Sequence, residues 1–198
     1  MKYILLLFLL VFCTGKNPVQ TAESKLKQEV ILLNFYNNSN THLQQYLAKE
    51  VSVFYNCKVE IDITQGIPKR AYYAPRNRYK ADTIIKYLRV HNKKYSRVAG
   101  LTDKDISTTK GNIADYGIFG LGYCPGTSCI VSSFRLKGSS IKLLTVTLHE
   151  LGHTYGLPHC PNSECLMAAA NGKMIKTHDK PYMCGLCKNK LKSWIPGQ

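Results

Sequence analysis

The sequence predicts an α/β (α+β) fold built on a mixed, twisted sheet, and three observations support this. Apolar runs of strand length alternate with amphipathic segments of helical spacing in the first half of the chain. Two later strand-like segments lie close enough in sequence to pair as a hairpin. The 198 residues, with 44% hydrophobic and 20% charged side chains, suit one soluble domain with a sizeable core.

The N-terminus has the features of a secretion signal. Met1 and Lys2 form a short positive region, and residues 3–12 form an uncharged apolar run too short to span a bilayer. Cys13 follows Leu-Val-Phe, which resembles a bacterial lipobox except that Phe12 replaces the usual small residue. Residues 1–15 are therefore expected to direct export. The mature protein would be periplasmic, a lipoprotein anchored at Cys13, or secreted after ordinary cleavage near residues 14–15.

The chain after the signal begins with a polar tether and continues into a predicted single domain. Residues 16–27 lack periodicity and are assigned to the tether, and residues 28–198 to the domain. Residues 29–35 are predicted to form a buried strand. A polar turn then leads into an amphipathic helix that extends to about Phe54. Residues 58–64 alternate apolar and polar side chains as a second strand does.

The middle of the chain continues the same alternation. After a loop at residues 65–68, residues 72–77 lead into a helix over 79–88, whose apolar stripe contains Ile84, Ile85 and Leu88. Residues 97–102 are predicted to form the third strand, followed by a polar turn.

The last predicted strands precede a long helix. A loop around residues 110–112 separates the third strand from a Gly-rich strand at 116–123, and residues 129–136 form its predicted hairpin partner. Ser139 and Ser140 are candidate N-caps for a helix over residues 141–155.

This last helix carries the motif H-E-x-x-H. His149 and His153 are four residues apart, so both imidazoles project from one helix face and can hold one metal ion. Glu150 follows the first histidine, where its carboxylate can reach a metal-activated water without ligating the metal. Chance matches to this short motif occur on ordinary amphipathic helices, so the following residues decide its meaning.

The residues after the helix extend the motif to H-E-x-x-H-x-x-G-x-x-H. Gly156 can adopt the left-handed conformation that ends a helix, and Pro158 would not continue one. The chain can therefore turn back and present His159 as a third ligand. Three histidines with an open coordination position describe a catalytic zinc site, whereas structural zinc sites are closed by four protein ligands.

Four cysteines follow the third histidine. Cys160 and Cys165 are followed in the sequence by the C-x-x-C pair Cys184 and Cys187. Four thiolates match a closed tetrahedral zinc site. Two disulfides are the alternative, which export would permit. We favour zinc, because a C-x-x-C pair rarely closes on itself and the cysteines adjoin another metal motif. A zinc ion here would fix the direction in which His159 points.

Together these motifs resemble the archaemetzincin family of zinc metallopeptidases, within the metzincin clan. The resemblance is close over residues 148–191, through H-E-L-G-H-T-Y-G-L-P-H-C, C-L-M and C-G-L-C, and looser in R-x-x-Y-x-A, F-G-L-G and S-x-F-R-L before it. It implies a metzincin-like zincin with a small zinc-clamped C-terminal part and two zinc ions per chain. It implies that Met167, which alone would indicate only a core methionine, forms the Met-turn beneath the catalytic zinc. The assigned ligands are His149, His153 and His159 for the catalytic zinc and Cys160, Cys165, Cys184 and Cys187 for the structural zinc.

The expected function is hydrolysis of peptide bonds, with Glu150 as general base. The expected partner is a peptide or protein substrate, aligned by resemblance along the strand at residues 116–123, and the protein is expected to be a monomer. A non-catalytic zinc scaffold that binds a polyanion is the alternative, as is hydrolysis of another bond. The formal charge of +15 would suit a polyanion. However, the basic residues are scattered and no nucleic-acid module is present, so no nucleic acid is expected.

The remaining cysteines and histidines are given lesser roles. Cys124 and Cys129 flank a Pro-Gly turn, so a small disulfide between them is possible in an oxidising compartment. Cys57 is expected to be a buried thiol. Three histidines without partners at ligand spacing are expected to be ordinary surface or core residues: His42, His91 and His178.

Overall fold

The structure of the protein is a computed structural model that describes residues 29–38, 40–170 and 180–195. The predicted signal peptide with Cys13, the predicted tether and His178 lie outside the described residues. Among the described helices, none is long and apolar enough to cross a membrane.

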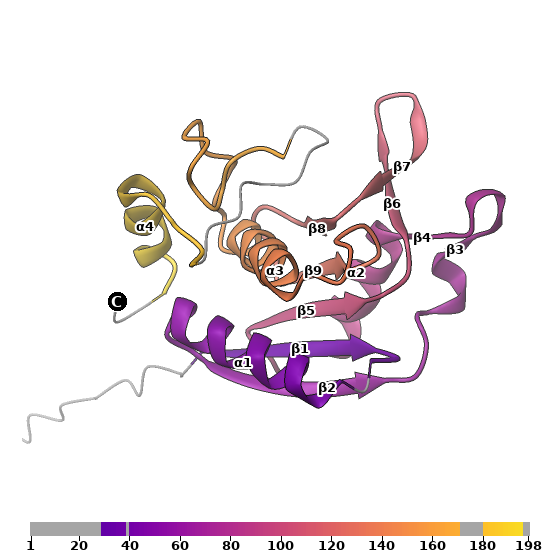
Figure 1. Cartoon of the computed structure of the whole chain (residues 1–198), viewed down its shortest axis with the longest axis horizontal. Helices are drawn as coiled ribbons and strands as arrows, with labels where there is room; N and C mark the ends of the chain where they lie inside the picture. The colour runs from indigo at the N-terminus through magenta and orange to yellow at the C-terminus, as the bar shows by residue number, and fades with distance from the viewer. Residues whose placement is uncertain (1–28, 39, 171–179, 196–198) are drawn as a thin grey trace, which may run out of the picture.

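The core of the molecule is a five-stranded sheet with the strand order β2-β1-β5-β9-β8 (Figure 1). Neighbouring strands are parallel except for β8, which pairs antiparallel with β9 and forms one edge. The strand bounds are β1 Val30–Tyr36, β2 Lys58–Thr64, β5 Arg97–Thr102, β8 Gly120–Gly122 and β9 Ser128–Ser132. The predicted mixed sheet and its antiparallel hairpin are confirmed.

Helices cover both faces of this sheet. Helices α1 (Thr41–Tyr55) and α3 (Ser140–Thr154) pack on one face and α2 (Ala81–His91) on the other (Figure 1). The residues of β1 form an almost unbroken apolar run because the strand is buried on both faces. Ile31, Leu33 and Phe35 join the core under α1 and α3, whereas Leu32 and Tyr36 join the core under α2.

A second, four-stranded sheet has the order β3-β4-β6-β7. Its strands are short, with bounds β3 Tyr72–Tyr73, β4 Arg78–Lys80, β6 Ile106–Lys110 and β7 Ile113–Ile118. Two short 3-10 helices, η1 Lys69–Ala71 and η2 Ala74–Arg76, flank β3. Strand β7 is an edge of this sheet, and after the bend at Phe119 the chain continues into β8.

Several predicted boundaries were wrong in this region. The predicted helix over residues 79–88 begins at Ala81, because Tyr79 and Lys80 pair with β6. The predicted Gly-rich strand over residues 116–123 is divided between β7 and β8, and the predicted strand over 129–136 ends at Ser132. Strands β3, β4 and β6 were not predicted.

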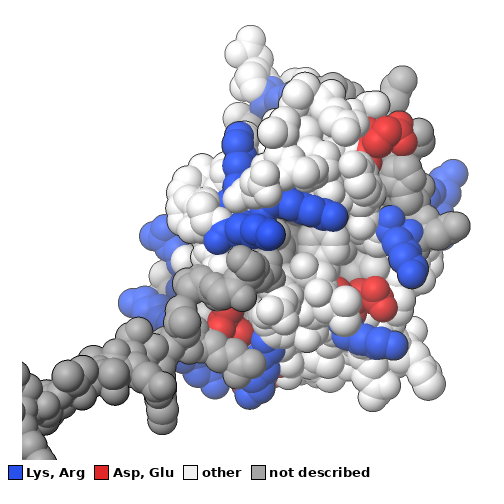
Figure 2. Space-filling model, turned by 90° about the vertical axis from the view of Figure 1, so that its left-hand side faces the viewer, with Lys and Arg blue, Asp and Glu red and all other residues white. Residues whose placement is uncertain are grey.

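The C-terminal part ends in α4 (Gly185–Lys192), which lies on the side of the molecule where α1 ends (Figure 1), and Lys188 and Leu191 of α4 line a pocket with Phe54 of α1. The face of the molecule in Figure 2 carries lysine and arginine side chains spread over its surface, with few acidic residues. On this face the basic residues form no single block, in agreement with their scattered positions in the sequence.

Candidate active site

Helix α3 carries two of the three candidate metal-binding histidines and the candidate base. Ser139 caps the helix, its hydroxyl oxygen accepting a hydrogen bond from the backbone N–H of Lys142 at 3.4 Å. The helix ends at Thr154, and Gly156 follows with φ of +73°. This left-handed conformation favours glycine and turns the chain back toward the helix, as predicted.

The three imidazoles meet at one point. His149 Nε2 and His153 Nε2 are 3.0 Å apart, and the candidate ligand atoms of His149, His153 and His159 all lie within 4.8 Å of one another. His149 and His153 are buried, whereas His159 is exposed. The predicted histidine cluster is therefore brought together in space.

Hydrogen bonds on the outer nitrogens orient two of these rings. The Nδ1 atoms of His149 and His153 lie 2.7 Å from the carbonyl oxygens of Leu166 and Leu157, respectively. A carbonyl oxygen can only accept, so each Nδ1 carries the proton and each Nε2 keeps a free lone pair. Burial lowers the pKa of His149 to about 3 and also lowers that of His153. Two neutral Nε2 lone pairs directed at each other would be stabilised by a cation between them, so the residues fit a zinc ion.

Glu150 is held beside these ligands at the edge of β8. Its side chain is buried, and a Cβ placed on Gly120 would lie 2.8 Å from its Oε1. Burial raises the pKa of Glu150 to about 8, and a backbone hydrogen bond at Gly122 acts in the opposite direction. Strand β8 is glycine-rich because side chains at residues 120 and 122 would collide with Glu150. From the sequence, F-G-L-G is recognisable only as a family feature, and this packing was not predicted.

Met167 lies beneath the helix. Its side chain is fully buried, and its Sδ would be 2.5 Å from a Cβ on Gly152. Gly152 lies between His149 and His153 on α3, so Met167 packs against the helix segment that carries these two histidines. Its neighbour Leu166 supplies the carbonyl that orients His149.

A cleft of about 640 Å³ opens over the histidines and Glu150. One wall is the edge of β8, and another is the β6–β7 hairpin, which contributes Lys110 and Tyr116. Arg135 also lines this cleft. Its role was not predicted, because it comes from a turn after β9 and reaches the cleft only through the tertiary fold.

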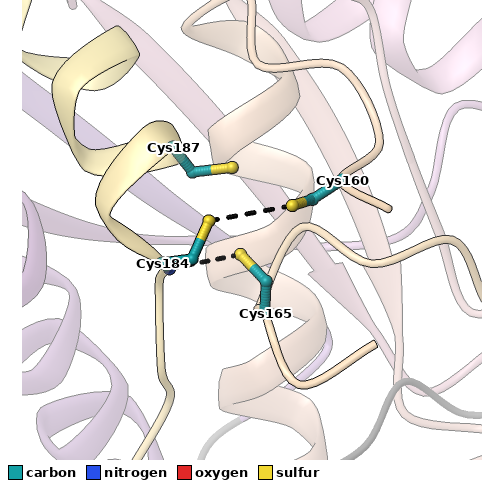
Figure 3. A group of neighbouring side chains, drawn as sticks. All are labelled: Cys160, Cys165, Cys184 and Cys187. Atoms are coloured by element: carbon teal, nitrogen blue, oxygen red, sulfur yellow. Dashed lines mark hydrogen bonds between the residues drawn. The ribbon is translucent and has the colours of Figure 1, made fainter. Parts of the chain in front are cut away.

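The four predicted cysteines form a second cluster (Figure 3). Their sulfur atoms all lie within 4.8 Å of one another, and Cys160 Sγ is 3.7 Å from Cys184 Sγ. All four cysteines are free in the structure, and the 3.7 Å between Cys160 and Cys184 exceeds the roughly 2.05 Å of a disulfide, so the structure does not contain the two disulfides of the alternative.

Cys184 occupies the N-cap of α4. A backbone hydrogen bond at Cys187 is the largest cause that lowers the pKa of Cys184, to about 7. Stabilisation of a thiolate at a helix N-terminus favours metal ligation. Four convergent sulfurs, one of them readily ionised, fit a tetrahedral zinc ion.

The other described cysteines and histidines belong to neither cluster. Cys57 is a buried free thiol, as predicted. Cys124 is exposed and Cys129 is buried, and both are free, so the disulfide that was left open between them does not form. His42 and His91 are exposed, as expected of ordinary histidines.

Four features together define a zinc metallopeptidase of the metzincin type. They are a helix with H-E-x-x-H, a third histidine after a glycine turn, a buried glutamate beside a glycine-rich edge strand, and a methionine packed beneath the helix. The model of peptidase family M54 matches residues 19–193 of the chain. The chain therefore belongs to peptidase family M54, the archaemetzincins, and is a zinc-dependent metallopeptidase.

Individual relatives agree with this assignment. The archaemetzincin of Methanopyrus kandleri is 33% identical over 131 residues, which cover 64% of this chain and 73% of the relative. Its crystal structure superposes with a TM-score of 0.71 at 27% identity, covering 84% of this chain and 95% of the other. The archaemetzincin of Archaeoglobus fulgidus, solved in complex with malonate, gives a TM-score of 0.67 at 25% identity and covers 82% and 99%. These relatives give no support to a non-catalytic zinc scaffold.

Proposed function

We propose that His149, His153 and His159 hold the catalytic zinc ion of this peptidase and that Glu150 is its general base. The observation that carries the proposal is the convergence of two buried, neutral Nε2 lone pairs 3.0 Å apart, with the Glu150 carboxyl beside them. The bound zinc would supply a Lewis acid that lowers the pKa of a water molecule and polarises the scissile carbonyl.

Glu150 moves the proton in this scheme. Its carboxylate accepts a proton from the attacking water and then donates it to the leaving amine. The buried setting that raises the pKa of Glu150 to about 8 favours a carboxyl that can hold this proton between the two steps. The carbonyl oxygens of Leu157 and Leu166 keep the imidazoles oriented while the proton moves.

The substrate pairs with the free edge of β8. This edge lies in the cleft beside Glu150, and its opposite edge is already paired with β9. A peptide in extended conformation would add one strand to the sheet, and backbone hydrogen bonds would align its scissile bond with Glu150.

The four-cysteine cluster would hold a second zinc ion, giving two ions per chain. Cys160 directly follows His159, and its backbone N–H donates to the carbonyl oxygen of Met167 at 2.7 Å. A metal at the cysteines would therefore fix both the third histidine and the turn beneath the active site.

Metal analysis combined with peptide cleavage tests these assignments. The wild-type chain should contain two zinc ions and cleave a mixed peptide library, whereas His149→Ala should contain one and be inactive. Glu150→Gln should keep both ions and lose activity by about 10²–10⁴-fold, which is the usual contribution of general acid–base catalysis. Parent-rate cleavage by Glu150→Gln would refute the role of the base.

The N-terminal sequence supports export of this peptidase, with Cys13 as the lipidation site of a membrane-anchored form. Fractionation of the producing cell tests both points. Replacement of Cys13 by Ser should move the protein from the membrane to the soluble exported fraction, and unchanged partitioning would contradict lipidation.

A further inference from the structure

The cleft has one strongly basic end. Among the described residues that line it, Glu150 is the only carboxylate, whereas Lys110 and Arg135 are both cationic. The Lys110 ammonium lies 4.6 Å from the centre of the Tyr116 ring and forms no ion pair with any described residue. Both cations belong to the side of the cleft formed by β6, β7 and the turn after β9.

Arg135 is held in place by two hydrogen bonds and keeps one nitrogen free to donate. Its Nε and Nη2 donate to the two carboxylate oxygens of Asp105 at 2.9 and 2.8 Å, and its Nη1 has no hydrogen-bond partner in the described part of the chain. The guanidinium packs against Gly117, where a Cβ would lie 2.6 Å from its Cζ. With 31% of its side chain exposed, Arg135 retains access to the cleft.

The surrounding ion pairs leave positive charge in excess. Asp105 is shared between Arg78 and Arg135, and Asp115 is shared between Arg76 and Arg78. Three guanidinium groups therefore face two carboxylates, which leaves a net charge of +1 before Lys110 is counted. A partly desolvated arginine with a free donor, in a cleft that a lysine also lines, suits a carboxylate ligand.

The position along the edge strand relates this basic end to the scissile bond. Glu150 lies against Gly120 and Arg135 against Gly117, three residues earlier and at most about 10 Å away at 3.3 Å per residue. A peptide that pairs antiparallel with β8, as β9 does, runs from Gly122 toward Gly117. Its residues on the carboxyl side of the scissile bond would therefore approach Arg135.

We propose that Arg135 and Lys110 form a subsite for a substrate carboxylate located two or three residues C-terminal to the scissile bond. This inference rests on the proposed function. The carboxylate can come from an aspartate or glutamate side chain or from the C-terminus of a short peptide. Both sources present the planar two-oxygen group that a guanidinium binds.

Matched peptides test the subsite without any mutation. One pair carries Asp or Asn at the second and third positions after the scissile bond, and another carries a free or an amidated C-terminus at the same distance. The wild-type enzyme should cleave the peptide with the carboxylate with a kcat/KM at least about tenfold higher, mainly through a lower KM. Preference in the first pair identifies a side chain, and preference in the second identifies the terminus.

Variants assign the preference to the two cations. Arg135→Gln should lose the preference while still cleaving the neutral peptides, and Arg135→Lys should restore part of it. Lys110→Gln, at an exposed position, should weaken the preference even if Arg135→Gln fails to fold. Lys49→Gln, which removes an exposed charge from α1, is the control and should leave it unchanged.

The possible failures are distinguishable. Equal cleavage within both wild-type pairs would overturn the subsite and leave the peptidase assignment intact. Equal losses on all peptides in Arg135→Gln would show that Arg135 only braces β7. Absence of any cleavage by the wild-type enzyme would overturn the proposed function and the subsite together.

Discussion

Single residues at the edge of β8 determine where the Glu150 carboxyl lies, and Glu150 is the proposed general base. Gly120 leaves no space for a side chain, because an added Cβ would be 2.7 Å from Glu150 Cγ and 2.8 Å from Oε1. We therefore expect Gly120→Ala to displace the carboxyl and lower kcat/KM by about 10²-fold, the cost of a displacement of about 1 Å in a catalytic group. Peptide cleavage and zinc content measured together should show lost activity with both ions retained.

The matched control for this change is Gly185→Ala. An added Cβ at Gly185 meets no atom within 4 Å, and the residue is the first of α4. Activity should be unchanged there. Parent activity in Gly120→Ala would mean that Glu150 need not occupy the position seen in the structure.

Thiol reactivity should distinguish the cysteines outside the metal cluster. Cys124 is exposed, whereas Cys129 is fully buried and burial raises the pKa of Cys57 to about 12. At about pH 8 a thiolate-directed reagent should modify Cys124 rapidly, and Cys57 and Cys129 only after unfolding, because a buried protonated thiol is unreactive. Peptide mapping by mass spectrometry of protein that has not been reduced would measure this. A Cys124–Cys129 disulfide in the folded protein would contradict the structure.

At the scale of elements, the partly buried ion pair of Glu29 and Arg97 joins the start of β1 to the end of α3. Arg97 Nη1 lies 2.6 Å from Glu29 Oε1, the Tyr155 hydroxyl donates to the same oxygen at 2.9 Å, and Arg97 stacks over the Tyr155 ring. Tyr155 is the C-cap of α3, and Tyr55 of α1 donates to the carbonyl oxygen of Leu148 at 2.6 Å in the same region. These contacts anchor the active-site helix to the sheet.

Replacement of Glu29 by Ala should reveal the strength of this anchor. It leaves the Arg97 guanidinium buried without its carboxylate, which typically costs about 3 kcal/mol. Urea unfolding should show this loss in the free energy of unfolding. Glu60→Ala, which breaks the exposed Lys58–Glu60 pair, is the control and should give no measurable change. Similar effects in both variants would show that the Glu29 anchor is no stronger than a surface pair.

The elements that could be predicted from sequence are those with a strong local pattern. Strands β2 and β5 were predicted with their observed bounds, and α3 to within one residue at each end, because alternation, an unbroken apolar run and an N-cap are local signals. Strand β4, with the sequence Arg-Tyr-Lys, has no such signal. It exists because its backbone pairs with β6 and Arg78 binds Asp105, and both contacts span more than 25 residues.

The same distinction applies to the active site. The histidines and cysteines that converge in the two clusters could be predicted, because their spacings in the sequence match those of known metal sites. The groups that orient them could not, since the carbonyl oxygens of Leu157 and Leu166 belong to residues of unremarkable type. Arg135 was missed as a cleft residue for a similar reason, since only the packing of its turn against Gly117 brings it there.

At the scale of the whole molecule, the position of the histidines depends on the cysteine cluster, whereas the position of the cysteines depends less on the histidines. The loop from Cys160 to Ala168 provides the Leu166 carbonyl that orients His149, and the backbone N–H of Leu166 donates to the carbonyl oxygen of Tyr182 at 2.5 Å. The cysteines connect this loop to α4, a short helix with only two buried side chains, Cys187 and Leu191. The metal ion proposed there would therefore substitute for a core that this part of the chain is too small to form.

This dependence predicts an asymmetry between two variants. His159→Ala should lose the catalytic zinc and activity while keeping the cysteine-bound zinc and most of the thermal stability. Cys184→Ser should lower Tm by at least about 6 °C, since each kcal/mol corresponds to about 2–4 °C for a chain of this size, and should also weaken the catalytic zinc because His149 and His159 lose their support. Zinc content, differential scanning calorimetry and peptide cleavage, measured on both variants and on the wild type, would reveal the asymmetry. If Cys184→Ser kept the catalytic zinc and the parental kcat/KM, the two sites would be independent, and the adjacency of His159 and Cys160 would have no mechanical consequence.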